Sequence, residues 1–144
     1  MIRDTFRVVV GALIYNSEGK FLLAQRYEKD TNLPGIWAIP AGHAEEVLNS
    51  LDSLEENLRR EVREEIGVEI NIEKYFDSHS WVTDEYKKIT IIFLCTITSG
   101  EPQKLEETAD LAWVEVSDLP NYKLAPNIER LITKADKFLQ NKGE

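Results

Sequence analysis

Three glutamates stand close together in one stretch of the chain: Glu61, Glu64 and Glu65. On a helix with about 100° per residue they share an arc of roughly 100° and therefore lie on one face. Like charges three and four residues apart repel one another. A hard divalent cation removes this repulsion, and Mg²⁺ or Mn²⁺ prefers carboxylate oxygens together with water and phosphate. The spacing therefore indicates a site for such a cation.

The same stretch also has a purely structural interpretation. Glu55 and Arg59, and likewise Glu56 and Arg60, are four residues apart, and such pairs stabilise an exposed helix. Charge-rich helix faces commonly do nothing more than contact solvent. The spacing alone leaves both a cation site and a solvated helix face open.

An amphipathic helix must position these carboxylates. Ser53 is a suitable N-cap, and Glu56 three residues later can complete a capping box. Gly67 is a typical helix stop. Between them an apolar residue recurs every four positions, which predicts a helix with one buried stripe. The stripe consists of Leu54, Leu58, Val62 and Ile66.

Strands are expected on both sides of this helix. Asn16 to Gly19 form a turn signal, which predicts that the first two strands make a hairpin. Ser117 and Pro120 mark a short helical turn, and an apolar pattern from Pro126 onward predicts a second amphipathic helix. We expect an α+β fold, an α/β/α sandwich in which a mixed sheet is flanked by the two helices, as one domain over residues 1–144. The expected strands are 6–15, 20–26, 36–39, 70–81, 87–98 and 111–116.

The formal net charge of −9 is unevenly distributed. Nine acidic and three basic residues lie between Gly42 and Glu69, so this stretch carries two-thirds of the negative excess. Nucleic-acid backbones are bound through Lys and Arg, which disfavours a nucleic-acid polymer as partner. An acidic protein can still bind a phosphorylated small molecule where a metal reverses the local field.

Cysteine content and hydropathy indicate the compartment. Cys95 is the only cysteine, so no internal disulfide can form. Arg3, Asp4 and Arg7 interrupt the apolar core that a signal peptide would need. The longest apolar-rich runs, 8–15 and 89–97, are far shorter than the ~20 residues of a membrane-spanning helix. We expect a cytoplasmic protein without membrane association.

The segment from Arg60 to Val68, REVREEIGV, resembles the second half of the Nudix box, R-E-U-x-E-E-x-G-U, where U is aliphatic. All specified positions match. The segment 35–43 is similar to the one that leads into the box, and 22–26, 100–107 and 113–120 are similar to other parts of Nudix proteins. The resemblance covers nearly the whole chain and implies a Nudix-like fold.

One departure concerns the loop before the helix. Gly42 and Arg60 enclose seventeen residues, four more than the Nudix pattern. Counting back from Arg60 places Asp52 where the family has its first glutamate. Glu45 or Glu46 from the longer loop could substitute for that glutamate.

The resemblance implies an enzyme, a hydrolase that splits a pyrophosphate bond in a nucleoside diphosphate derivative with Mg²⁺, or alternatively Mn²⁺. Glu61, Glu64 and Glu65 would hold the metal. Arg60 would orient a neighbouring glutamate. The general base would be either Glu61 or a carboxylate of a later loop, where Glu107 stands beside Glu106.

The substrate implied first is a nucleoside triphosphate, which would give a nucleoside monophosphate and pyrophosphate. ADP-ribose and nucleotide sugars are the alternatives, as is a catalytically weak nucleotide-binding module on the same fold. Relatives often form dimers, so a homodimer is a further expectation.

Substrate contacts are expected from aromatic and polar side chains. Two of the candidates also have a structural interpretation, as packing for Trp37 and as a salt bridge for Arg26. Asn127 is included because a similar asparagine reads the base in some MutT-like relatives. The expected substrate-binding residues are Arg26, Trp37, Gly42, Trp81 and Asn127.

Overall fold

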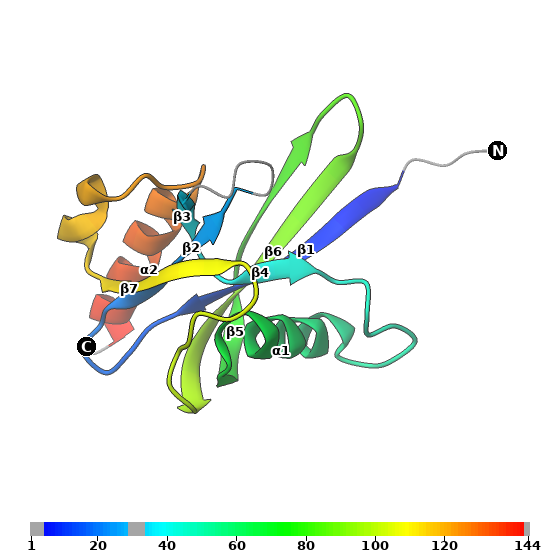
Figure 1. The fold of residues 1–144 in the computed structure, drawn as a ribbon. Coiled ribbons are helices and arrows are strands. Elements are labelled where there is room, and N and C mark those ends of the chain that lie inside the picture. Colours follow the sequence, from blue (N-terminus) through cyan, green and yellow to red (C-terminus); the bar gives the residue numbers. More distant parts are fainter. Residues whose placement is uncertain (1–4, 29–33, 143–144) are drawn as a thin grey trace.

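Two β-sheets form the centre of the protein in the computed structural model, which describes residues 5–28 and 34–142 (Figure 1). In the first sheet the order is β4 (Ala41–His43), β1 (Phe6–Ile14), β6 (Lys87–Ser99) and β5 (Glu69–Val82). Strands β1 and β6 are parallel and the other neighbours are antiparallel, so this sheet is mixed. The second sheet is antiparallel, in the order β3 (Pro34–Ala38), β2 (Phe21–Tyr27) and β7 (Thr108–Val114).

A helix packs on each side of the first sheet. Helix α1 (Ser53–Ile66) buries its apolar stripe in one core, and α2 (Ile128–Lys142) buries its own in another. Strand β1 contributes to both, because successive side chains of a strand point to opposite faces. Val10 and Ala12 contact the core of α1, and Leu13 contacts the core of α2. The expected α/β/α sandwich is confirmed.

The predicted hairpin of the first two strands is wrong. The turn itself forms, since the Gly19 amide donates to the Asn16 carbonyl at 2.9 Å, and Tyr15 bridges to Phe21. Beyond that bridge β1 and β2 belong to different sheets. β1 pairs with β6 along its length and with β4 over Val9–Gly11, whereas β2 pairs with β3 and β7.

The ends of α1 differ in how well local sequence predicts them. Gly67 ends the helix as expected, in the left-handed conformation with φ of 72°. The predicted N-cap is wrong: Asp52 occupies that position, and Ser53 is the first helical residue. The Ser53 hydroxyl donates to the Val47 carbonyl at 2.6 Å instead of capping the helix. A long-range contact with the preceding loop therefore replaces the local capping box.

The remaining elements lie close to their predicted positions, with one addition. The expected helical turn is the 3₁₀ helix η1 (Val116–Asn121). Strand β4 was not expected, because a three-residue strand has no periodicity of its own and depends on pairing with β1. Strands β5 and β6 make a long hairpin whose turn end projects away from the two helices (Figure 1). None of the helices within 5–28 and 34–142 has the length and apolar character needed to cross a membrane. Arg3 and Asp4, which entered the signal-peptide argument, lie outside the described residues.

Asp77 joins β5 to α2 through two ion pairs. Its carboxylate is 9% exposed and lies 3.0 Å from Arg130 Nη2 and 2.8 Å from Lys134 Nζ. Hydrogen bonds from Arg130, opposed by burial and supported by Lys134, lower the pKa of Asp77 from 3.8 to about 2. The native state therefore favours the ionised carboxylate more than the unfolded chain does.

We expect Asp77→Asn to lower the free energy of unfolding by up to about 2 kcal/mol at pH 7. This upper bound is the free energy that corresponds to the difference between the native and unfolded pKa of Asp77. Solvent screening at the half-exposed Arg130 and Lys134 side chains reduces it. Because the native pKa is depressed, this stabilisation is complete above about pH 4 and disappears as the pH falls toward 2. Urea denaturation of both proteins between pH 2 and 7 measures it. If the free energies of unfolding of wild type and Asp77→Asn differ by the same amount at every pH in this range, the ionised Asp77 carboxylate does not stabilise the fold.

Candidate active site

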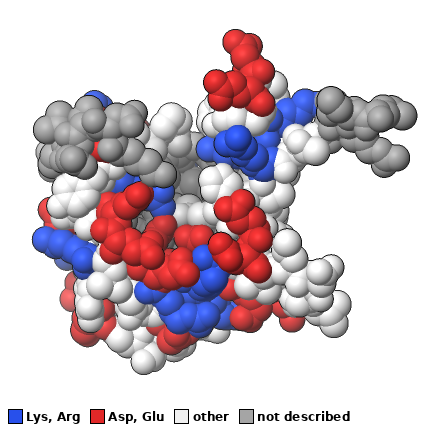
Figure 2. Space-filling model, turned by 45° about the vertical axis from the view of Figure 1, so that its right-hand side comes forward, with Lys and Arg blue, Asp and Glu red and all other residues white. Residues whose placement is uncertain are grey.

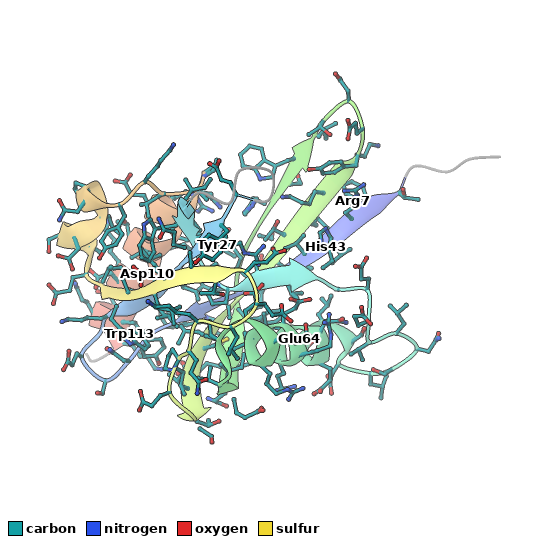
Figure 3. The ribbon with its side chains drawn as sticks, in the orientation of Figure 1. Arg7, Tyr27, His43, Glu64, Asp110 and Trp113 are labelled. Atoms are coloured by element: carbon teal, nitrogen blue, oxygen red, sulfur yellow. The ribbon has the colours of Figure 1, made fainter. Side chains whose placement is uncertain are left out.

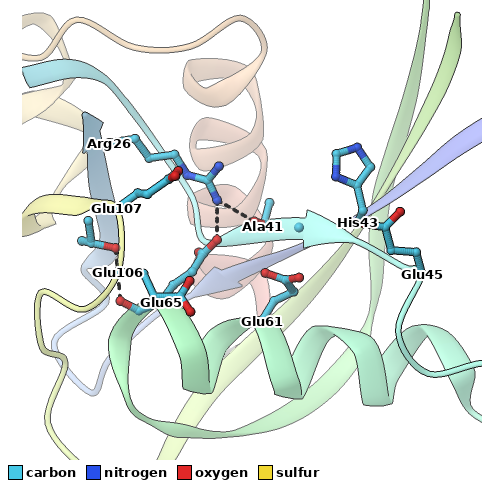
Figure 4. A pocket seen from close by; sticks show the side chains of 10 residues that line it. Arg26, Ala41, His43, Glu45, Glu61, Glu65, Glu106 and Glu107 are labelled. Atoms are coloured by element: carbon cyan, nitrogen blue, oxygen red, sulfur yellow. Dashed lines mark hydrogen bonds and ion pairs between the residues drawn. The ribbon is translucent and has the colours of Figure 1, made fainter. Parts of the chain in front are cut away.

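A polar pocket lies where α1 faces β4 and the segment before β7 (Figures 2 and 4). Figure 2 shows acidic side chains gathered on this face of the protein. The pocket therefore combines several carboxylates with a single guanidinium. Its charged lining consists of Arg26, Glu45, Glu61, Glu65, Glu106 and Glu107.

Glu65 is the most deeply buried of these carboxylates, at 8% exposed. It forms an ion pair with Arg26, whose Nη2 also donates to the Ala41 carbonyl at 2.7 Å. Burial raises the pKa of Glu65 to about 7, against the opposing effect of Arg26 and with further support from Glu61 and Glu106. The ionised form of this buried carboxylate would gain from a nearby cation.

The segment before β7 is attached to the C-terminal end of α1. The Glu65 carbonyl accepts hydrogen bonds from the Thr108 hydroxyl at 3.1 Å and from the Leu105 amide at 3.2 Å. These bonds satisfy a helix-end carbonyl that has no partner within the helix. Glu106 follows in the left-handed region, with φ of 48°. This attachment brings Glu106 and Glu107 to the pocket, forty residues along the chain from the helix glutamates.

Glu61 lies between a glycine and an arginine. A Cβ atom built on Gly42 would stand only 2.1 Å from Glu61 Cδ, so only glycine leaves room for this carboxylate. Arg60 Nη2 donates to Glu61 Oε1 at 2.9 Å. Burial raises the pKa of Glu61, although Arg60 opposes this effect. Gly42 therefore has a steric role at the site.

Glu64 lies outside the lining of the pocket, on the outward side of α1 (Figure 3). It is 42% exposed, and its Oε2 accepts from Arg60 Nη1 at 3.0 Å. Arg60 thus pairs with both neighbouring glutamates, which raise its pKa against the effect of burial. Among the described residues, Arg60 Nε is buried without a hydrogen-bond acceptor.

The longer loop brings Glu45 to the pocket and leaves Asp52 away from it. Asp52 is the N-cap of α1 and makes no side-chain capping bond within the described structure. Glu45 lies two residues after the end of β4 and lines the pocket together with His43 (Figure 4). Of the candidates for the missing first glutamate, the geometry favours Glu45.

The donor set suits a hard divalent cation in its chemistry, since the charged lining is rich in carboxylates and the Ala41 carbonyl is close by. Over the parts of the chain that the structure describes, no three His, Cys, Asp or Glu side chains are already arranged as a metal cluster. Arg26 and Arg60 instead neutralise Glu65 and Glu61. A cation that binds Glu65 would have to replace the Arg26 contact.

The expected substrate residues fall into separate places. Arg26 and Gly42 line the pocket. Trp37 packs edge-on against Tyr122, with ring centroids 5.0 Å apart, beside the core of α2. Trp81 is 45% exposed on β5.

His79 contacts both Asn127 and Trp81. Asn127 Nδ2 is 2.8 Å from His79 Nδ1, and Asn127 Oδ1 accepts from Arg130 Nε at 2.6 Å. The His79 and Trp81 rings meet edge-on at 5.6 Å. Because Arg130 fixes the Asn127 amide, His79 Nδ1 is the acceptor, which agrees with the lowered pKa of His79, caused first by burial.

Some contributors to the site were not predicted from the sequence. Ala41 acts through its backbone carbonyl and Thr108 through a bond to the backbone of α1, so neither carries a local signal. Asn57 is fully buried on α1. It lies four residues before Glu61 and therefore on the same helix face, and its contacts with the preceding loop carry no local signal.

Comparisons with known proteins agree with this geometry. The NUDIX domain model matches residues 5–135. Nucleoside triphosphatase NudI of Escherichia coli O139:H28 is 33% identical over 132 residues, covering 82% of this chain and 88% of the relative. NudI of Klebsiella pneumoniae is 32% identical and covers 92% and 97% of the two chains.

A solved structure shows the same fold over the full length. The MutT protein of Methanosarcina mazei Go1 superposes with a TM-score of 0.74 at 26% identity, and the match covers 99% of each chain. The family model, the sequence relatives and the shared fold all lead to one conclusion. The chain belongs to the Nudix family and is a Nudix-type nucleotide pyrophosphohydrolase.

Proposed function

We propose that this protein hydrolyses nucleoside triphosphates to a nucleoside monophosphate and pyrophosphate, with Mg²⁺ or Mn²⁺ as cofactor. The carboxylate pocket between α1, β4 and the segment before β7 is the observation that carries the proposal. The substrate class is supported by the relatives named nucleoside triphosphatase, at 33% identity.

The size of the pocket supports a binding mode in which one part of the substrate lies inside the pocket and the other part lies outside it. Its volume is about 230 Å³, less than the ~300–1,000 Å³ of pockets that enclose a drug-sized ligand. A diphosphate group with its cation is small enough for this space, and the carboxylate-rich lining suits that group better than an apolar base. We therefore place the scissile pyrophosphate in the pocket and the nucleoside outside it.

In the pocket, Glu61 and Glu65, with Glu64 from the adjoining face, would hold the cation. A bound divalent cation neutralises non-bridging phosphate oxygens and lowers the pKa of coordinated water. Arg26, released from Glu65, would bind a phosphate oxygen, and Arg60 would keep Glu61 and Glu64 oriented. Either Glu61 or Glu107 would accept the proton of the attacking water.

Outside the pocket, the nucleoside would contact the surface formed by Trp81, His79 and Asn127. Trp81 offers an exposed ring for stacking, and the fixed amide of Asn127 offers a hydrogen-bonding group. Trp37 is the weaker candidate for stacking because it packs against Tyr122 and the core of α2.

A substrate panel tests the proposal directly. Wild-type protein is incubated with Mg²⁺ and, separately, dNTPs, NTPs, ADP-ribose, nucleotide sugars and dinucleoside polyphosphates, and the products are resolved by chromatography. We expect monophosphate and pyrophosphate from triphosphates at the highest kcat/KM. Faster turnover of ADP-ribose or a nucleotide sugar would replace the proposed substrate, and absence of any product would overturn the activity.

Adding Mg²⁺ should raise the melting temperature, because a ligand that binds only the folded state stabilises it. At tenfold excess over the dissociation constant the gain is about 1.4 kcal/mol, or roughly 4 °C for a chain of this size. Differential scanning fluorimetry measures the shift, with the double variant Glu61→Gln/Glu65→Gln as control. An equal shift in the control would assign the effect to cation binding elsewhere.

A further inference from the structure

The loop between β4 and α1, residues 44–52, is held against the helix by one buried amide. Asn57 is 0% exposed. Its Oδ1 accepts from the Glu46 amide at 3.2 Å and the Val47 amide at 3.1 Å. Its Nδ2 donates to the Val47 carbonyl at 2.9 Å and to the Ser53 carbonyl at 2.7 Å. Both donors and both acceptor sites of the side chain are thus used.

These bonds fix the backbone on one side of Glu45, and β1 fixes it on the other. The Ala44 amide donates to the Val8 carbonyl at 2.9 Å. Glu45 is therefore held between two anchored neighbours, and it lines the carboxylate pocket (Figure 4). A loop of this length without such anchors would sample many conformations.

We propose that Asn57 is a positioning residue, which holds the longer loop so that the Glu45 carboxylate stays at the cation pocket. The inference rests on the proposed function of that pocket. A purely structural role would predict that removal of Asn57 lowers stability and leaves cation binding unchanged once the protein is folded. The two roles are distinguished by whether substitutions at Asn57 and Glu45 have coupled effects on cation affinity.

The test is a double-mutant cycle on Mn²⁺ affinity, measured by titration calorimetry without substrate. We expect Asn57→Ala and Glu45→Gln each to weaken binding about tenfold, as is usual for residues that position metal ligands. The double variant should bind no more weakly than either single variant, because Asn57 acts through Glu45. Additive losses, or an unchanged affinity in Asn57→Ala, would overturn the inference.

Two further variants separate positioning from stability. Val62→Ala removes buried apolar atoms one turn farther along α1 and should destabilise the protein with Mn²⁺ affinity unchanged. Asn57→Asp keeps an acceptor for the Glu46 and Val47 amides but places an oxygen against the Val47 and Ser53 carbonyls, so it should also weaken Mn²⁺ binding. If Asn57→Ala does not fold, an unchanged affinity in Asn57→Asp would contradict the inference.

Hydrogen exchange gives a readout that is independent of cation and substrate. The Glu46 and Val47 amides should exchange faster in Asn57→Ala than in wild type, and at the wild-type rate in Val62→Ala. Unchanged exchange would show that Asn57 does not hold the loop. If the substrate panel yields no product, the proposed activity fails, while calorimetry and exchange still decide the role of Asn57.

Discussion

The Glu65→Gln variant should fold as wild type does and lose at least about a hundredfold in kcat, the lower end of the contribution of a catalytic carboxylate. Glutamine has the same shape, so Arg26 and the helix end keep their packing. Burial already raises the pKa of Glu65 to about 7, so a neutral side chain at this position costs little stability. What the variant removes is the negative charge that would attract the cation.

Steady-state kinetics on the best substrate of the panel measures the loss, with circular dichroism and thermal unfolding as checks on the fold. Glu56→Gln is the matched control, since Glu56 is on the same helix, forms an ion pair with Arg59 and lies outside the pocket. Near-wild-type turnover by Glu65→Gln would refute the assignment of this pocket as the active site.

The Glu64→Gln variant tests whether Glu64 belongs to the cation site, a point on which the helical spacing and the structure differ. The spacing places Glu64 with Glu61 and Glu65, whereas in the structure it is exposed, paired with Arg60 and outside the pocket. A loss as large as that of Glu65→Gln would mean that Glu64 turns toward the cation when it binds. A small loss would restrict the site to the carboxylates that already line the pocket.

The parts of the fold that the sequence predicts are those determined by neighbouring residues. The four-residue apolar repeat of α1 and the left-handed stop at Gly67 depend on contacts within one or two helical turns. The prediction is wrong where distant residues compete. Strand β2 pairs with β3 and β7 rather than with β1, and Ser53 bonds to Val47 rather than capping its helix.

The same distinction applies to the site. Glu61 and Glu65 are on one face of a helix, so their proximity follows from helical geometry alone. Their partners come from other parts of the fold: Arg26 from β2, and Glu106 and Glu107 from a segment attached to the end of α1. No spacing in the sequence relates Asn57 to Glu46, because the loop between them has no regular structure.

The second large effect is expected at Gly42, where backbone and carboxylate approach closely. An added methyl group would lie 2.1 Å from Glu61 Cδ, well inside van der Waals contact, so Gly42→Ala must displace that carboxylate by more than about 1 Å. A misplacement of this size can cost about a hundredfold in rate. We expect a decrease in kcat of that order, with little change in the fold because β4 lies at the edge of its sheet.

A double-mutant cycle with Glu61→Gln determines whether the effect passes through that carboxylate. If it does, adding Gly42→Ala to Glu61→Gln should change kcat by less than about twofold, since the two substitutions remove the same contribution. Gly11→Ala is the matched control. Gly11 pairs with the neighbouring Ala41 in the same strand pair, and its Cβ would meet only Ile39 Cδ1 closely, at 3.2 Å. A comparable loss in Gly11→Ala, or full additivity in the cycle, would show that distortion of β4 and not the displaced Glu61 causes the loss.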